Sequence, residues 1–250
     1  MIGCIIQARM GSSRLPGKVM MKIDGKNSIL YYVVTQLRCC KNVQKFVVAT
    51  TKNKEDDVIE EFSTNFDVSF FRGDAEDVLD RYYQCSKKFS FSSIVRITAD
   101  NPLIDPQIVD KVIETFQSGN YDYVTNCLIR TFPYGTEVEV FSFNALEKAW
   151  KNAKKPSERE HVTPYFYNNK EKFKMFNVIN SENLSHLRWT VDREEDLKLV
   201  MMIVRKIHNR PMLTKDIINL FSKESDLINI NKNLVPKEGY LKSLKEDEKF

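Results

Sequence analysis

Short apolar segments alternate with longer amphipathic ones through the first half of the chain, and few folds accommodate that order. Segments that suit buried strands fall at residues 2–6, 45–50, 68–71, 93–98 and 121–125. Segments with apolar residues at helical spacing separate them, at residues 29–37, 56–62, 75–87 and 106–117. Strands that alternate with helices form βαβ units, so the sequence predicts an α/β fold with three layers, α/β/α, around a mostly parallel sheet.

The alternation stops after Asn126. The pattern then predicts strands at 135–141, 173–179 and 187–191 and helices at 144–150, 157–168, 194–207 and 215–221. We expect a single domain over residues 1–228, from which a β/α arm protrudes at about 128–175. Residues 229–250 are rich in Lys, Glu and Asn, which predicts a loosely held polar tail.

Composition narrows the class of protein. With 42% hydrophobic residues in 250, the chain can bury a core of single-domain size. A net charge of +4, from 38 basic and 34 acidic residues, favours a nucleotide or an acidic metabolite over nucleic acid as partner. The five cysteines lack zinc-ligand spacing, and no apolar run approaches the roughly 20 residues that span a bilayer. We expect reduced thiols, no membrane partner and a cytoplasmic location.

A small, basic loop follows the first predicted strand, at residues 7–18 (QARMGSSRLPGK). Its glycines permit sharp turns and its serines add hydroxyl donors. Backbone N–H groups and cations at the carboxyl end of a strand offset phosphate charge. Walker A spacing is absent, because Val19 follows Lys18 where Ser or Thr is needed. We expect a triphosphate-binding loop in which Arg14 and Lys18 supply positive charge; the alternative is a basic surface turn.

A second polar segment, residues 95–106, begins in a predicted strand and ends in an acidic loop. In a doubly wound sheet this loop lies on the same edge as residues 7–18, where ligands bind. Asp100 can therefore meet the triphosphate, and Mg²⁺ takes one or two carboxylates together with phosphate oxygens and water. The alternative is that Asp100 only begins a helix, although Asp105 before Pro106 suits that role better.

Asp192 stands between the predicted strand 187–191 and the predicted helix 194–207. It can supply a second carboxylate to the same magnesium ion. The alternative is a helix N-cap, a position that aspartate often fills.

Taken together and in this order, the segments resemble the cytidylyltransferase branch of the nucleotide-diphospho-sugar transferase fold, and most closely the SpsF-like proteins. The resemblance runs from Ile2 to about Ile207. It rests on five motifs, namely IIQARMGSSRLPGK (5–18), FRGDAEDVLDRY (71–82), VRITADNPLIDP (95–106), EREHVTPY (158–165) and RWTVDREEDL (188–197). It implies a Rossmann-like sheet and Mg²⁺-dependent nucleotidyl transfer from CTP.

The resemblance also implies roles for the matching residues. Arg14, Lys18 and Asp100 would act in catalysis, and Asp100 and Asp192 would hold Mg²⁺. The residues that would contact CTP are Gln7, Ala8, Arg9, Gly11, Ser12, Ser13, Arg72, Gly73 and Thr98, with Arg72 and Gly73 near the base.

Four residues are candidates for contact with the acceptor. Arg159, Glu160 and His161 match the sugar-side motif of the family, and Glu137 lies in an irregular stretch of the kind that often carries substrate recognition. His161 would meet a carboxylate or phosphate, or would be a helix-surface histidine. The loop reads GSSR where synthetases of acidic sugars usually read GSKR or GGSK, so the acceptor stays open.

The implied reaction condenses CTP with an acidic or phosphorylated sugar-like acceptor and releases pyrophosphate. The product would be a CMP- or CDP-activated precursor for surface polysaccharide or glycoconjugate synthesis, made by a homodimer. The alternative is a glycosyltransferase of the same fold that uses a nucleotide-sugar donor. The sequence lacks a DxD metal motif near its middle, which favours the nucleotidyltransferase.

Overall fold

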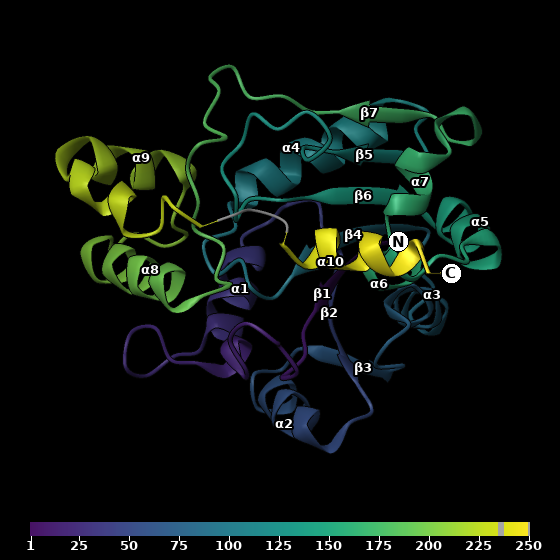
Figure 1. Cartoon of the computed structure of the whole chain (residues 1–250), viewed down its shortest axis with the longest axis horizontal. Coiled ribbons are helices and arrows are strands. Elements are labelled where there is room, and N and C mark those ends of the chain that lie inside the picture. The colour runs from purple at the N-terminus through teal and green to yellow at the C-terminus, as the bar shows by residue number, and fades with distance from the viewer. Residues whose placement is uncertain (235–237, 250) are drawn as a thin grey trace.

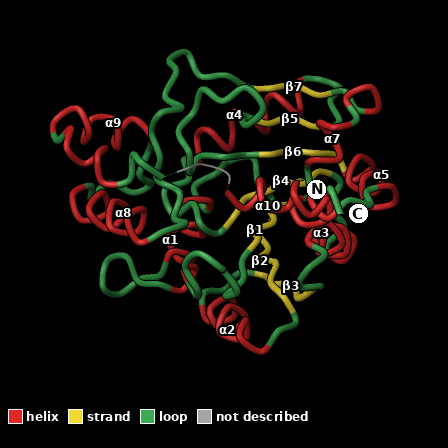
Figure 2. Tube along the Cα trace, viewed as in Figure 1, coloured by secondary structure: helices red, strands yellow, loops and turns green. Residues whose placement is uncertain are grey.

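A seven-stranded sheet runs through the middle of the molecule (Figures 1 and 2). The computed structural model describes residues 1–234 and 238–249. The strand order is β3-β2-β1-β4-β6-β5-β7, and β6 alone runs antiparallel to its neighbours. The strands are β1 (Ile2–Gln7), β2 (Lys45–Thr51), β3 (Ser69–Gly73), β4 (Ser93–Thr98), β5 (Tyr123–Thr125), β6 (Glu139–Ser142) and β7 (Met175–Asn177). The predicted mostly parallel sheet is confirmed.

Helices cover both faces of the sheet. Side chains alternate between the faces along each strand, so Ile6 of β1 packs into one apolar cluster and Ile5 into the other. The first cluster includes side chains of α1 (Ile29–Leu37), α2 (Asp57–Asn65) and α4 (Pro106–Ser118). The second includes side chains of α3 (Val78–Lys88), α5 (Phe143–Asn152) and α7 (Pro164–Asn168). The predicted three layers are confirmed. Short 3₁₀ turns are η1 (Lys18–Met20), η2 (Lys54–Asp56) and η3 (Lys170–Lys172).

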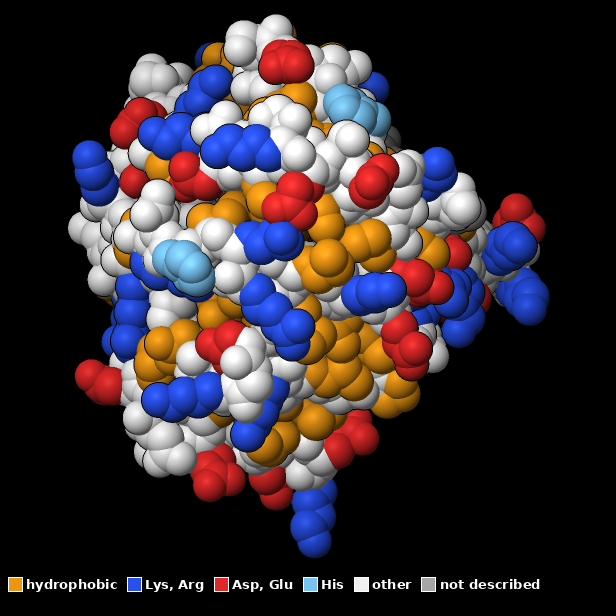
Figure 3. Space-filling view, turned by 90° about the vertical axis from the view of Figure 1, so that its left-hand side faces the viewer, with side chains coloured by type: hydrophobic (Ala, Val, Ile, Leu, Met, Phe, Trp, Pro, Cys, Tyr) orange, Lys and Arg blue, Asp and Glu red, His pale blue; other side chains and the backbone are white. Residues whose placement is uncertain are grey.

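A third apolar cluster lies beside the carboxyl edge of the sheet. It joins α8 (Glu194–Lys206), α9 (Thr214–Lys223) and the 3₁₀ helix η4 (Ser225–Ile230) around the fully buried Trp189. Figure 3 shows this side of the molecule, where apolar side chains lie between charged ones. The cluster anchors the start of α8 next to the ends of the central strands.

Two predicted elements differ from the observed ones. Residues 187–191 form an extended connection with one β-bridge, between Arg188 and Tyr134. The connection crosses the ends of the strands, where the Val191 N–H donates to the Asp100 carbonyl oxygen (2.8 Å), so it cannot extend the sheet sideways. The helix expected at 157–168 is divided into α6 (Pro156–His161) and α7, because Val162 between them has a φ of 71°.

The segment 128–175, where an arm was expected, contributes to the body of the sheet as well. Within it, β6 is inserted between β4 and β5, and its Val140 and Phe141 are fully buried. The alternating pattern of 135–141 predicts a strand that the structure begins only at Glu139, and this polar position faces the partly buried Arg96 of β4.

The end of the chain is more ordered than its composition predicts. Residues 229–234 continue from η4 with Asn231 buried, and α10 (Glu238–Asp247) packs against α6. The remainder of the predicted tail, residues 235–237 and 250, lies outside the described residues. No helix in the described part of the chain is long and apolar enough to cross a bilayer.

Candidate active site

A cleft of about 970 Å³ opens at the carboxyl ends of β1 and β4. Its walls come from the loop that follows β1, the end of β4, the start of α3, and helices α6 and α10, which lie together in front of the sheet in Figure 1. Twelve residues predicted for the site line it: Gln7, Arg9, Gly11, Ser12, Ser13, Arg14, Lys18, Thr98, Asp100, Arg159, Glu160 and His161.

The loop 7–18 is held in shape by a buried carboxylate. Met10 N–H donates to Asp56 Oδ1 (2.7 Å), and Asp56 Oδ2 accepts from the backbone N–H (3.1 Å) and the hydroxyl (2.5 Å) of Thr51 at the end of β2. The loop closes where Gly17 N–H donates to the Met10 carbonyl oxygen (2.9 Å). Gly17 has a φ of 70°, which glycine adopts without strain.

This shape leaves donors available in the loop. The backbone N–H groups of Gly11, Ser13 and Arg14 have no acceptor among residues 1–234 and 238–249. Unpaired N–H groups in a loop at the carboxyl end of a strand are suited to phosphate oxygens.

Lys18 is the centre of the charged part of the cleft. Its ammonium donates to Asp100 Oδ2 (2.9 Å), Asp192 Oδ1 (2.9 Å) and the carbonyl oxygen of Val191 (2.7 Å), which uses its three donors. Burial acts to lower the pKa of Lys18, but the two carboxylates outweigh it and raise the pKa above its ordinary value. Lys18 is therefore a fixed positive charge that joins three distant segments.

Asp192 is surrounded by three cations. Its Oδ1 accepts from Arg14 Nη2 (2.6 Å) and Lys18, and its Oδ2 accepts from Arg188 Nη2 (3.2 Å). Burial acts to raise the pKa of Asp192, but Lys18 and Arg14 hold it well below its usual range. The alternative role of Asp192 as an N-cap is wrong, because Arg193 occupies the N-cap position of α8.

A buried ion pair fixes Arg188 in turn. Asp196, which has no exposed surface, accepts from Arg188 Nε (2.9 Å) and Nη2 (2.9 Å) and from Asn231 Nδ2 (2.7 Å).

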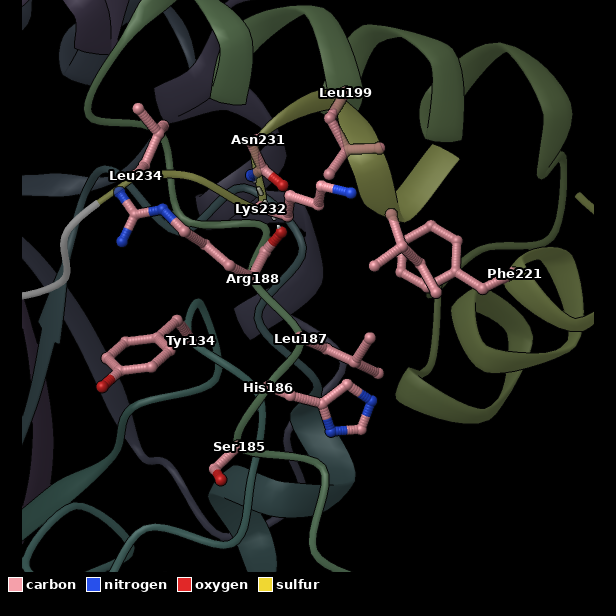
Figure 4. Close-up of a pocket in the computed structure, with 11 residues that line it drawn as sticks. Tyr134, Ser185, His186, Leu187, Arg188, Leu199, Phe221, Asn231, Lys232 and Leu234 are labelled. Carbon is pink, nitrogen blue, oxygen red and sulfur yellow. Dashed lines mark hydrogen bonds between the residues drawn. The ribbon is translucent and has the colours of Figure 1, made fainter. Parts of the chain in front are cut away.

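Arg188 also borders a separate pocket of about 190 Å³ (Figure 4). In this pocket Asn231 donates to the Arg188 carbonyl oxygen, and Leu187, Leu199 and Phe221 supply apolar walls. Arg14, Lys18 and Asp100 line the larger cleft, and Asp192, which is outside its lining, is hydrogen-bonded to Arg14 and Lys18, so we place the chemistry there.

The two predicted metal carboxylates converge. Asp100 and Asp192 each lie 2.9 Å from the same Lys18 nitrogen, so one positive charge already sits between them. No group of three or more His, Cys, Asp or Glu side chains suited to a metal occurs within the described ranges. Two carboxylates beside the basic loop 7–18 nevertheless match the donors that Mg²⁺ takes in nucleotide sites.

The opposite wall of the cleft carries the predicted acceptor residues. Glu160 and His161 lie at the end of α6, with Arg9 Nη2 3.9 Å from Glu160 Oε1. Arg159 lines the cleft, but its guanidinium is bound to Asp77 at the start of α3 and to the Trp150 carbonyl oxygen (2.9 Å). Arg159 therefore joins α6 to α3.

Arg72 and Gly73 are not brought into the cleft. Arg72 donates to the carbonyl oxygens of Thr51 (2.8 Å) and Asn53 (2.7 Å) and pairs with Asp57 (2.7 Å) and Glu60 (2.8 Å). Its guanidinium thus ties β3 to the start of α2. A Cβ on Gly73 would lie 2.7 Å from Arg81 Cγ, so the glycine serves close packing.

Glu137 and Ala8 also lie outside the cleft lining. Glu137 accepts from Arg130 Nη1 (2.7 Å) and from the Gly135 N–H (2.8 Å), which braces the loop before β6. Gly135 has a φ of 106°, and a Cβ there would lie 2.8 Å from the Thr190 nitrogen, so only glycine fits this approach. Ala8 is buried and extends β1.

Sequence reasoning missed Arg96, which lines the cleft from β4. It pairs with Glu139 of β6, which also accepts from the Tyr123 hydroxyl (2.5 Å), and its Nη2 lies 3.4 Å from Gln7 Oε1. Burial acts to lower the pKa of Arg96, but Glu139 outweighs it and raises the pKa. The feature of the sequence that could have revealed Arg96 is its charge within an otherwise apolar predicted strand.

Comparisons with known proteins agree on one family. The family model described as Cytidylyltransferase matches residues 3–234. An uncharacterized protein of Methanocaldococcus jannaschii is 42% identical over 232 residues, which cover 92% of this chain and 94% of that protein. The spore coat polysaccharide biosynthesis protein SpsF of Bacillus subtilis is 32% identical over 232 residues, which cover 89% and 94%. The solved structure of a cytidylyltransferase from Leptospira borgpetersenii serovar Hardjo-bovis matches with a TM-score of 0.88 and 36% identity, over 94% of this chain and 98% of the other.

Proposed function

We propose that this chain, which belongs to the cytidylyltransferase family, transfers a cytidylyl group from CTP to an anionic, sugar-like acceptor and releases pyrophosphate. The observation that carries the proposal is the convergence of Lys18, Asp100 and Asp192 beside a loop with unpaired backbone N–H groups. The three side chains come from three segments at one edge of the sheet, so the fold itself assembles the charged half of the cleft.

The triphosphate is proposed to lie on the loop 7–18. The N–H groups of Gly11, Ser13 and Arg14 would donate to its oxygens, and the Arg14 guanidinium and Lys18 would offset its charge. An oxygen of the acceptor attacks the α-phosphorus in line, a new P–O bond forms, and the bond to pyrophosphate breaks. The protein contributes positioning and charge stabilisation, and no covalent intermediate with a side chain is needed.

Asp100 and Asp192 are the residues that would hold Mg²⁺. When bound, the ion would neutralise triphosphate charge, which is its usual contribution to nucleotidyl and phosphoryl transfer. Because the three donors of Lys18 are already used, Lys18 would release a carboxylate to the ion when it donates a hydrogen bond to a phosphate oxygen.

The acceptor is proposed to bind along the wall that carries Glu160 and His161. An attacking hydroxyl would give a CMP-activated product, and an attacking phosphate a CDP-activated one. Because the name of the Bacillus subtilis relative refers to spore coat polysaccharide biosynthesis, we propose that the product is a precursor for a surface polysaccharide or glycoconjugate.

The test is to incubate the protein with Mg²⁺, each of the four nucleoside triphosphates and a panel of acceptors, while pyrophosphate is measured. The panel contains a nonulosonic acid, an octulosonic acid, a phosphorylated polyol and a phosphorylated amino sugar. We expect pyrophosphate release with CTP and one acceptor class. Release of free nucleoside diphosphate from a nucleotide sugar, without pyrophosphate from any triphosphate, would establish the glycosyltransferase alternative instead.

We also propose that the protein is a homodimer, as the resemblance to the family implies. Sedimentation equilibrium of the full chain decides this, since a single species at the mass of one chain would contradict it.

A further inference from the structure

Helix α10 lies across the cleft and supplies six of its lining residues: Glu238, Gly239, Tyr240, Lys242, Ser243 and Glu246. It begins after residue 234, where the match to the family model ends. The comparison with the family model therefore says nothing about its role.

Both ends of α10 are tied to other helices. At its start, Glu238 Oε2 accepts from Arg193 Nη2 (2.7 Å) at the beginning of α8. At its end, Asp247 accepts from the backbone N–H (2.9 Å) and the hydroxyl (2.6 Å) of Ser157 in α6. Between them, a Cβ on Gly239 would lie 3.1 Å from Arg14 Nη1, so the helix passes over a cation of the triphosphate loop.

The polarity of α10 is the reverse of that of an ordinary surface helix. Leu241 and Leu244 are 50% and 37% exposed, whereas Ser243 is 2% exposed. An amphipathic helix that only covers a core turns its leucines inward. Because α10 turns a polar side inward, its packing is explained by contacts in the cleft and not by apolar burial.

Ser243 makes the central contact. The Ser243 hydroxyl has two acceptors, Glu160 Oε2 and the Gly239 carbonyl oxygen (3.2 Å); the carboxylate oxygen is the nearer one and can only accept, so we assign the proton to that bond. The Ser243 oxygen then accepts from His161 Nε2 (3.0 Å), which places the ring proton on Nε2. Burial lowers the pKa of His161 and outweighs the opposing effect of Glu160, so the ring is neutral at pH 7.

The second nitrogen of the His161 ring is left as an acceptor. His161 Nδ1 carries no proton in this tautomer, and it has no hydrogen-bond donor among residues 1–234 and 238–249. The His161 ring also packs perpendicular to the ring of Tyr240 of α10, with ring centroids 5.2 Å apart at 85°. His161 and Glu160 both line the cleft, so α10 fixes the two groups that are left to accept hydrogen bonds from hydroxyls.

We propose that Ser243 is a positioning residue of the acceptor half: it holds His161 as the Nε2–H tautomer and Glu160 in place, so that both accept hydrogen bonds from hydroxyl groups of a polyhydroxylated acceptor. This inference rests on the proposed function. It adds that the C-terminal helix is part of the active site.

The test compares Ser243→Ala with Ser243→Thr, which keeps the hydroxyl, and with Ser222→Ala, which removes a hydroxyl bonded only to a carbonyl oxygen of its own helix α9. Long-range ¹H–¹⁵N spectra report the tautomer of each of the three histidines, and the His161 signals are assigned with His161→Gln. At pH 7.5 we expect His161 to be the Nε2–H tautomer in the native chain and in the Ser243→Thr and Ser222→Ala variants. Ser243→Ala should lose this preference.

Kinetics supply the second readout, with CTP and the member of the acceptor panel that gives turnover. Ser243→Ala should raise the KM for the acceptor about tenfold, as expected for one lost hydrogen bond, and leave the KM for CTP within about twofold. Ser243→Thr should restore the native value.

An unchanged His161 spectrum in Ser243→Ala overturns the proposal, as does an equal rise in both KM values. If no acceptor yields pyrophosphate, the proposed function fails, but the imidazole spectra still decide whether Ser243 sets the tautomer of His161. Circular dichroism checks folding, and Ser243→Cys replaces Ser243→Ala if the alanine variant does not fold.

Discussion

The two halves of the cleft are built differently. In the triphosphate half, Lys18 and Asp192 come from segments fixed by the sheet and α8, and the Lys18 side chain is only 9% exposed. In the acceptor half, Glu160 and His161 come from the short helix α6, and the Glu160 side chain is 39% exposed. A network of charges around a buried ammonium is rigid but intolerant of loss, whereas partly exposed groups on a short helix are replaced at smaller cost. The proposed chemistry therefore rests on the first half and the choice of acceptor on the second.

The largest expected effect follows from Lys18→Met, which would leave Asp100 and Asp192 without their shared cation. Breaking a buried ion network by removing one partner costs about 3 kcal/mol of unfolding free energy. Loss of the charge should also lower kcat by at least ~10²-fold. Urea unfolding and pyrophosphate release measure the two effects, with the exposed Lys26→Met as the matched control. If Lys18→Met keeps more than a tenth of the native kcat, the assignment of Lys18 to the active site is wrong.

A direct comparison of the halves uses two carboxylate-to-amide changes. Asp192→Asn should lower kcat by about 10²-fold with every acceptor, because three cations lose their common partner. Glu160→Gln should instead raise the KM for the acceptor about tenfold and leave kcat nearly unchanged. Steady-state kinetics with both substrates varied separates these outcomes. Equal effects on kcat in the two variants would mean that the halves do not differ as described.

A smaller effect is expected from Arg72→Ala. Its guanidinium ties β3 to the start of α2, so the variant should lose about 1 kcal/mol of unfolding free energy, moderated by solvent at the exposed partners. The KM for CTP should stay within about twofold, since Arg72 is not in the cleft lining. Thermal unfolding and CTP kinetics are the measurements. A large rise in KM for CTP with unchanged stability would restore the role near the base that the family resemblance implies.

The smallest expected effect is the dependence of stability on pH. The folded pKa of His161 is lowered, so the unfolded chain binds more protons as the pH falls below about 6.5, and stability decreases from there through the folded pKa. The pKa of Asp192 is lowered too, so its contribution is present above about pH 4 and is lost below it. Unfolding temperatures between pH 8 and 3 should therefore fall in two steps. His161→Gln should remove the first step, and Asp192→Asn should reduce the second, to which Asp24 and Asp74 also contribute because their pKa values are lowered as well.

Local signals predicted much of the fold correctly. Ser28 caps α1 by accepting from the Tyr31 N–H (3.2 Å), and Asp105 before Pro106 caps α4 through the Gln107 N–H (2.8 Å). These features depend on neighbours within a few residues, so periodicity and cap chemistry reveal them. The turns of the loop 7–18 could be predicted for the same reason, since they depend on glycine and proline within the loop itself.

The remaining features depend on contacts between distant segments. Where β6 is inserted between β4 and β5, Glu139 pairs with Arg96, a residue far from it in the chain. The position of α10 depends on contacts with Ser157, Glu160 and His161, which lie 82 to 90 residues before their partners in the chain. The composition of that segment predicts a disordered tail. A helix that packs against a polar cleft with a polar side has no apolar face, so the hydrophobic pattern does not reveal it.

The most direct test of the division between the two halves is a crystal structure of the protein with CTP and Mg²⁺. The triphosphate should lie on the loop 7–18, within hydrogen-bond reach of Arg14 and Lys18, with the metal ion at Asp100 and Asp192. The wall of Glu160, His161 and Ser243 should remain open for the acceptor. A triphosphate bound against Glu160 and His161, or in the pocket beside Arg188, would contradict this account.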